Sequence, residues 1–235
     1  MSVRLGILYR FDLPDGSRTH FDFQFDPVSF RLTNPPPATP PFWTELEFSQ
    51  CTNCPLKGSD TTHCPPALHM ADATQRLAGL VSFDTVSVTV EQGERTVAAV
   101  TSAQAALSSV LGLIMAISAC PWTQLLRPMA RFHLPFADET ETVYRIVTMY
   151  LLAREFAGGS PDSGFGSLAE IYQNLHVVNR GMARRLGAAM STDPAQNAMA
   201  LLDSYTALLP AAIEDSLEEL RPLFEGWKRQ KPDPI

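Results

Sequence analysis

The chain has 235 residues, a formal net charge of −7 and a hydrophobic content of 45%. These values provide ample material for a buried core and exclude a largely disordered chain. An acidic chain also lacks the cationic surface on which nucleic-acid binding depends, so we find no strong nucleic-acid signal. The closest approach to a basic patch is formed by Arg180, Arg184 and Arg185.

No secretory signal is present, because the N-terminus has no charged region followed by a long apolar stretch. The most apolar segment, residues 105–120, is interrupted by serines and is short for a membrane span. We therefore expect a cytoplasmic protein with no membrane segment.

The first hundred residues predict antiparallel strands. Apolar residues alternate with polar ones on both sides of the turn at 14–17 and again on both sides of Gly93, which predicts two hairpins. Residues 34–41 hold five prolines and predict a stiff connector between two further short strands. The expected strands are 3–13, 21–25, 30–32, 42–48, 86–90 and 96–100.

The rest of the chain predicts helices. Capping boxes begin at Thr101 and Ser167, and Asp193 precedes a proline that suits a first helical turn. The expected helices are 67–80, 101–120, 122–132, 138–156 and 167–189, with two more before residue 227. Strands followed by helices favour an α+β fold, with N-terminal hairpins packed on a C-terminal helical bundle.

We predict one compact domain made of two regions. Residues 1–100 form the β-rich region, which contains a cysteine loop at 51–66. Residues 101–230 form the helical region, and 231–235 form a frayed tail.

The four cysteines suggest a metal site. Cys51, Cys54 and Cys64 follow the pattern C-x2-C-x9-C, and Cys120 stands at the end of the apolar helix. Thiolates are soft ligands that suit zinc and iron–sulfur clusters, and a reducing compartment favours metal binding over disulfides. We expect Cys51, Cys54, Cys64 and Cys120 to bind a cofactor at the junction of the two regions, with buried thiols without metal as the alternative reading.

The cofactor could be an iron–sulfur cluster or a zinc ion. One close pair, one nearby cysteine and one remote cysteine favour an iron–sulfur cluster, with [4Fe–4S] as a candidate type, over zinc. The segment Cys51–Leu56 resembles the CxxCPL segment of the iron–sulfur uracil-DNA glycosylases. That family's glycine-rich active-site segments and its His-Pro-Ser motif are missing here, so we predict no such activity. His63 or His69 is an alternate fourth ligand, which would give a Cys₃His zinc site.

Two functions follow from this site. The first is a cytosolic iron–sulfur protein with a redox or sensing role. The alternative is a non-enzymatic adaptor with structural zinc, which would bind a protein partner through its C-terminal helices. Thiol redox chemistry at Cys51 and Cys54 is less favoured, because such a pair should open a helix and here it lies in a loop. No catalytic residues are predicted, since no hydrolase or phosphate-binding motif is present.

Overall fold

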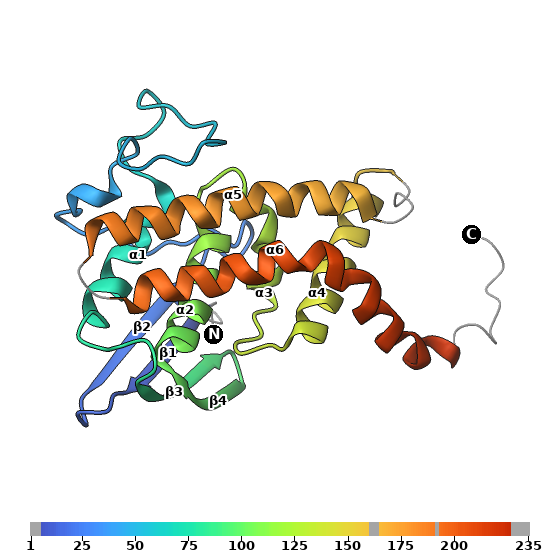
Figure 1. The fold of residues 1–235 in the computed structure, drawn as a ribbon, viewed down its shortest axis with the longest axis horizontal. Coiled ribbons are helices and arrows are strands. Elements are labelled where there is room, and N and C mark those ends of the chain that lie inside the picture. Colours follow the sequence, from blue (N-terminus) through green and yellow to red (C-terminus); the bar gives the residue numbers. More distant parts are fainter. Residues whose placement is uncertain (1–5, 160–164, 191–192, 227–235) are drawn as a thin grey trace.

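The computed structural model describes residues 6–159, 165–190 and 193–226. Its sheet has four antiparallel strands in the order β2-β1-β3-β4 (Figure 1). The strands are β1 (Gly6–Asp12), β2 (Arg18–Gln24), β3 (Thr85–Gln92) and β4 (Arg95–Ser102). Both predicted hairpins, β1–β2 and β3–β4, are present. Pairing of β1 with β3 joins the two hairpins into one sheet.

One face of the sheet is buried because apolar residues alternate along its strands. Ile7, Tyr9 and Phe11 on β1 are 0–1% exposed, and the three valines of β3 are equally covered. Register places Tyr9 between Phe21 of β2 and Val90 of β3. This apolar face packs against α2, whose Ser109 hydroxyl lies 2.7 Å from the Tyr9 hydroxyl.

Helices make up most of the remaining chain. They are η1 (Phe42–Thr44), α1 (Pro65–Arg76), α2 (Ala103–Ile117), η2 (Thr123–Leu126), α3 (Arg127–Arg131), α4 (Glu139–Phe156), α5 (Gly166–Ala189), α6 (Pro194–Leu220) and η4 (Arg221–Phe224). The two longest helices, α5 and α6, lie side by side and run in opposite directions (Figure 1). The prediction of an α+β fold is confirmed.

Local caps explain where two of the helices begin. The Asp138 side chain accepts from the Glu141 backbone N–H at the start of α4, and the Glu141 side chain accepts from the Asp138 N–H in return. At α2 the N-cap is Ser102, whose hydroxyl accepts from Ala105 N–H at 3.3 Å. The capping box predicted at Thr101 therefore places the N-cap of α2 one residue too early.

Three sequence predictions of local structure are wrong. Residues 42–48 form the short helix η1 and turns rather than a strand, because their carbonyl groups bond to a buried arginine. Residues 30–32 contribute a single bridge, Phe25 to Leu32, rather than a strand. The predicted pair of C-terminal helices is one long helix, α6, followed by the short η4.

Two clusters of buried apolar side chains form the interior. The first lies between the sheet, α1, α2, the second half of α5 and the start of α6. The second lies between α4, the first half of α5 and the second half of α6. The division at residue 100 and the single-domain assignment stay predictions. Within the described ranges, no helix has the length and apolar character needed to cross a membrane.

Candidate functional site

The segment that leads into the cysteine loop is fixed by Arg185 of α5. This side chain is 1% exposed, and its guanidinium donates to the carbonyls of Trp43, Glu45 and Leu46 at 2.6–3.0 Å. Charged donors make stronger hydrogen bonds than neutral ones, and they satisfy carbonyls that no strand partner reaches. Arg185 is therefore a structural residue and not part of the basic patch that the sequence suggested.

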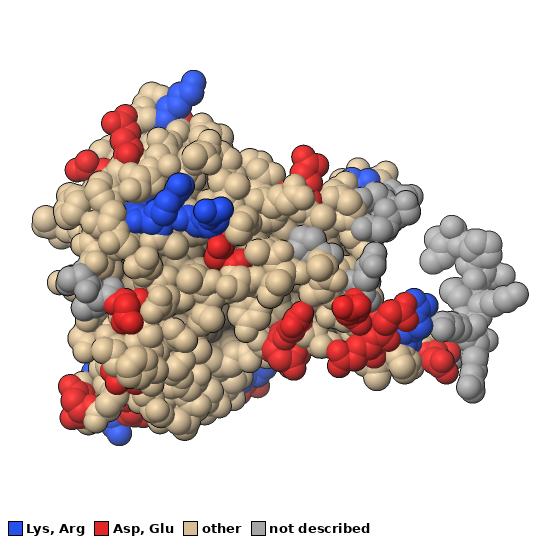
Figure 2. Space-filling model, viewed as in Figure 1, with Lys and Arg blue, Asp and Glu red and all other residues tan. Residues whose placement is uncertain are grey.

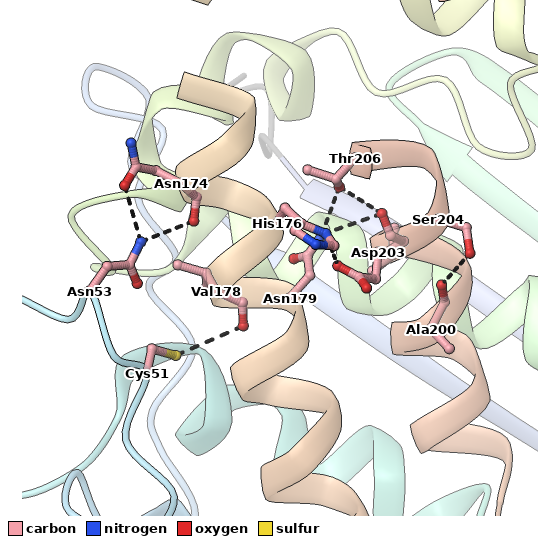
Figure 3. Close-up of polar contacts among 11 residues, drawn as sticks. Cys51, Asn53, Asn174, His176, Val178, Asn179, Ala200, Asp203, Ser204 and Thr206 are labelled. Carbon is pink, nitrogen blue, oxygen red and sulfur yellow. Dashed lines mark hydrogen bonds and ion pairs between the residues drawn. The ribbon is translucent and has the colours of Figure 1, made fainter. Parts of the chain in front are cut away.

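The cysteine loop itself packs against the same face of α5, as Figure 3 shows. The Cys51 thiol points at the Val178 carbonyl at 3.8 Å, and the Asn53 amide donates to the Asn174 carbonyl at 3.1 Å. The indole N–H of Trp122 donates to the Asn53 carbonyl at 2.8 Å. Gly181 makes the close contact feasible, because a Cβ there would lie 2.5 Å from Cys51 Sγ.

The four cysteines do not form the predicted metal site. Among the residues that the structure describes, no group of three or more His, Cys, Asp and Glu side chains could hold a metal ion. The predicted function is therefore wrong, both as an iron–sulfur protein and as an adaptor with structural zinc. Spacing alone misled the prediction, because three of the four cysteines are placed by separate contacts: Cys51 against α5, Cys64 before α1 and Cys120 after α2.

The other three thiols nonetheless interact electrostatically with the Cys51 thiol. Burial raises the pKa of the Cys51 thiol to about 12, and the thiols of Cys64, Cys120 and Cys54 raise it further in that order. Burial also raises the pKa of Cys64. All four are free cysteines, and the raised pKa values of Cys51 and Cys64 favour protonated thiols at these two positions. The identity of a cofactor, iron–sulfur or zinc, stays a prediction, which metal analysis of anaerobically purified protein would test.

The two alternate ligands have other roles. His63 Nδ1 lies 2.9 Å from the Thr44 hydroxyl, and His63 forms a bridge with Glu45. His69 is half-buried on α1, where burial lowers the pKa of its imidazole. His63 is therefore held within its own segment by these contacts.

A cavity of about 450 Å³ lies between α2, α4 and α6, close to where the two apolar clusters meet. Its walls are mainly apolar and include Leu113, Met129, Ile146 and Leu209. Leu208 on α6 also lines it and is 63% exposed, so the cavity opens to solvent there. A few polar side chains interrupt this lining, among them Arg145 of α4 and Tyr172 of α5.

Arg145 and Tyr172 form the polar part of the cavity. Arg145 uses its Nη2 to donate to the carbonyls of Met129 and Phe132, at 2.8 and 3.1 Å, and it faces no carboxylate within ion-pair distance in the described chain. Tyr172 is 6% exposed, and its hydroxyl bonds to none of the described residues. Burial raises the pKa of Tyr172 above its ordinary value and lowers that of Arg145.

A second polar group reaches the cavity from the sheet side. The Tyr9 hydroxyl lies between Ser109 Oγ, at 2.7 Å, and His133 Nε2, at 2.5 Å. Ser109 and His133 line the cavity, whereas Tyr9 stands behind them. Burial, aided by the charge of Arg145, lowers the pKa of His133 to about 3, so its imidazole is neutral near pH 7.

Sequence reasoning missed this cavity. Its residues come from helices far apart in the chain, and none belongs to a short motif. The one available signal was a charged residue at an otherwise apolar position: Arg145 directly precedes the buried pair Ile146 and Val147 on α4.

Comparison with known protein families gives a match over most of the chain. A family model described as "Domain of unknown function (DUF6901)" matches residues 7–225. No curated protein and no solved structure matches the chain.

Proposed function

Because the chain belongs to the DUF6901 family, whose description assigns no function, we propose a function from its cavity: the protein binds a small, mainly apolar molecule that carries one anionic oxygen group, such as a carboxylate. The observation that carries this proposal is the pair of Tyr172 and Arg145 in the cavity wall: the Tyr172 side chain is 6% exposed, and its hydroxyl makes no hydrogen bond to the described residues.

The size and lining of the cavity support an apolar ligand. Small-molecule sites usually have volumes of about 300–1,000 Å³, mainly apolar walls and a few polar groups that orient the ligand. The cavity volume of about 450 Å³ falls in this range, and its walls come from helices that are themselves well packed. An apolar chain placed here would be removed from water on several sides.

The charge of the polar part supports an anionic group. A half-buried guanidinium that forms no ion pair in the described chain favours an anion, and Arg binds carboxylates through parallel N–H donors. The charge of Glu141 raises the pKa of Arg145, but burial has the larger effect and lowers it. Both hydrogens of Nη2 are used by Met129 and Phe132, which leaves Nε and Nη1 of Arg145 to donate to a ligand. The Tyr172 hydroxyl would then donate a further hydrogen bond. Glu139 lines the exposed rim, where solvent screens its charge.

Titration of the full chain with decanoate tests the proposal. We expect decanoate to bind and to raise the midpoint of thermal unfolding, since a ligand that binds only the folded state stabilises it. Two matched probes separate the contributions: decanol lacks the charge, and acetate lacks the apolar chain. Each should bind at least tenfold more weakly than decanoate, equivalent to about 1.4 kcal/mol.

The Arg145→Gln variant completes the test. It should lower decanoate affinity roughly tenfold while leaving decanol affinity unchanged. Equal binding of decanoate and decanol by the unaltered chain would refute the anionic part of the proposal. Absence of binding by all three probes would refute the use of the cavity.

We further propose that a protein partner docks on the C-terminal end of α6 and on η4. Leu223 and Phe224 are 75% and 44% exposed there, and Figure 2 shows acidic side chains gathered over the same end of the molecule. The pattern fits a partner with an apolar and basic surface. A partner identified with the unaltered chain in cells should be lost with the double variant Leu223→Ser and Phe224→Ser, provided that the variant stays folded.

We also propose that the protein works in the cytoplasm. Its four free cysteines support a reducing compartment, because thiols in oxidising compartments are commonly paired in disulfides. Fractionation of cells that make the protein at its natural level tests this: recovery outside the cytoplasm would contradict it.

A further inference from the structure

The two edges of the sheet differ in how their backbone groups are satisfied. At the β2 edge, Asn34 donates to the Asp22 carbonyl and accepts from Gln24 N–H, both at 2.7 Å. Arg76 donates to the His20 carbonyl at 3.3 Å. Side chains from neighbouring segments thus occupy the groups that a further strand would need.

The β4 edge has no such cover. Gln92 and Arg95 face each other across a two-residue turn, so they form a hydrogen-bonded pair. Because hydrogen-bonded and non-hydrogen-bonded pairs alternate along antiparallel strands, every second residue from Arg95 to Thr101 bonds to β3. The alternate residues of β4 point their backbone N–H and C=O groups away from β3, toward the free edge of the sheet: Thr96, Ala98 and Val100. In the described chain nothing outside the ladder bonds to these groups.

The side chains of β4 add no protection against pairing. Natural edge strands commonly carry charges, prolines or bulges that keep other strands away. From Thr96 to Ser102 this strand has none of these, and its valine at position 100 is 72% exposed. On the core face, Val97, Ala99 and Thr101 are only partly covered, because the sheet ends beside them.

We propose that β4 is a self-association edge, at which the strand pairs antiparallel with β4 of a second copy of this chain. The residues Thr96, Ala98 and Val100, whose backbone groups point outward, are evenly spaced about Ala98, so an antiparallel copy in this register places each of them opposite another such residue. The two-fold axis would pass through Ala98. Thr96 would face Val100 of the other copy, and Ala98 would face its own counterpart.

This arrangement opposes no like charges and joins two four-stranded sheets into one continuous sheet. Three hydrogen-bonded residue pairs would supply six backbone bonds, since each such pair exchanges two. The contact is small, so we expect a dimer with a Kd on the order of micromolar. The proposal does not depend on ligand binding in the cavity.

Sedimentation equilibrium of the full chain over a range of concentrations tests the proposal. The variant Ala98→Lys places two ammonium groups opposite each other at the axis, and like charges at such positions disfavour pairing. We expect a concentration-dependent dimer for the unaltered chain and a Kd at least tenfold higher for the variant. Ala98→Pro, which removes an outward N–H and no bond to β3, should act in the same direction.

The matched control is His20→Lys. His20 lies in the same row of the outer sheet face as Ala98, through Arg10 and Thr89, but on the opposite edge. This variant should dimerise like the unaltered chain. Amide hydrogen exchange provides a second readout, because the amides of Thr96, Ala98 and Val100 should gain protection as the protein concentration rises.

A chain that stays monomeric at all concentrations would overturn the proposal. Dimers that form equally well with Ala98→Lys would also overturn it, because the contact would then lie elsewhere.

Discussion

Helix α5 contributes to two regions of opposite character. Gly181 faces the cysteine loop, whereas Tyr172 lines the cavity. These residues are nine positions apart, which is two and a half turns of an α-helix, so they lie on opposite sides of it. The loop side is closely packed against Cys51, while the cavity side borders open space, which the Tyr172 side chain lines.

Two arginines express the same contrast. Arg185 donates to three carbonyls on the loop side and is closed off from solvent. Arg145 donates through one nitrogen to two carbonyls and borders open space. Arg185 also keeps a donor without a partner, its Nε, but that donor is buried in packed protein, whereas the remaining donors of Arg145 lie at a cavity that a ligand can enter. The comparison teaches that the chemistry of this chain lies away from its cysteines.

Replacing Arg185 should have the largest effect. Arg185→Met removes the donors of three backbone carbonyls, and a broken buried polar network typically costs about 3–5 kcal/mol. We expect the free energy of unfolding, measured in urea, to fall by that amount. The control is Arg184→Met: its side chain is exposed, and we expect a change below about 0.5 kcal/mol. Equal effects would contradict the distinction between the two arginines.

The close contact of the loop with α5 can be broken at Gly181. Gly181→Ala would place a Cβ 2.5 Å from Cys51 Sγ and 3.2 Å from Cys51 Cβ. Overpacking of this kind usually costs about 1–3 kcal/mol. Gly79→Ala serves as the control, because nothing lies within 4 Å of a Cβ there.

A double variant tests whether the clash is with the sulfur. Cys51→Ala removes Sγ, so part of the loss in Gly181→Ala should be recovered when the two substitutions are combined. Additive losses in unfolding free energy would show that Cys51 does not press on Gly181.

The sequence predicted the parts of the fold that depend on local patterns. Alternation placed both hairpins, and Asp138 marked the start of α4, because these signals act between residues close in the chain. The segment 42–48 shows where this fails. Its alternating pattern suits a strand, yet its carbonyls bond to Arg185, about 140 residues away, and no local signal reveals that partner.

The candidate site could not be predicted for the same reason. The spacing of Cys51, Cys54 and Cys64 suggested convergence, but packing against α5 decides where the Cys51 sulfur points. The cavity depends on a void between three helices, and Arg145 and Tyr172 meet only because α4 and α5 border the same space. An empty space between helices produces no periodic pattern of residues in the sequence.

Replacing Tyr172 tests the role proposed for the cavity. Tyr172→Phe removes a hydroxyl that bonds to nothing described, so we expect the unfolding free energy to change by less than about 1 kcal/mol. Decanoate affinity should fall roughly tenfold, because a hydrogen bond to a charged group is lost. Tyr144→Phe is the control, since this exposed tyrosine of α4 does not line the cavity. A large loss of stability with unchanged affinity would contradict the assigned role.

The smallest effect expected near neutral pH concerns the pH dependence of stability through His133. Burial lowers its pKa from 6.5 to about 3 in the folded chain. Between these values the unfolded state binds more protons than the folded state, so stability falls as the pH falls. The loss begins near pH 6.5, amounting to roughly 0.5–1 kcal/mol between pH 7 and pH 6, and it continues toward the folded pKa.

His133→Gln removes this proton uptake, so the unfolding free energy of the variant, measured in urea across that pH window, should depend less on pH. His20→Gln, on the exposed edge of β2, is the control for replacing a histidine by glutamine away from the cavity. Parallel pH profiles for the unaltered chain and His133→Gln would mean that His133 is solvated, and that the cavity beside Tyr9 and Ser109 is wetter than its lining indicates.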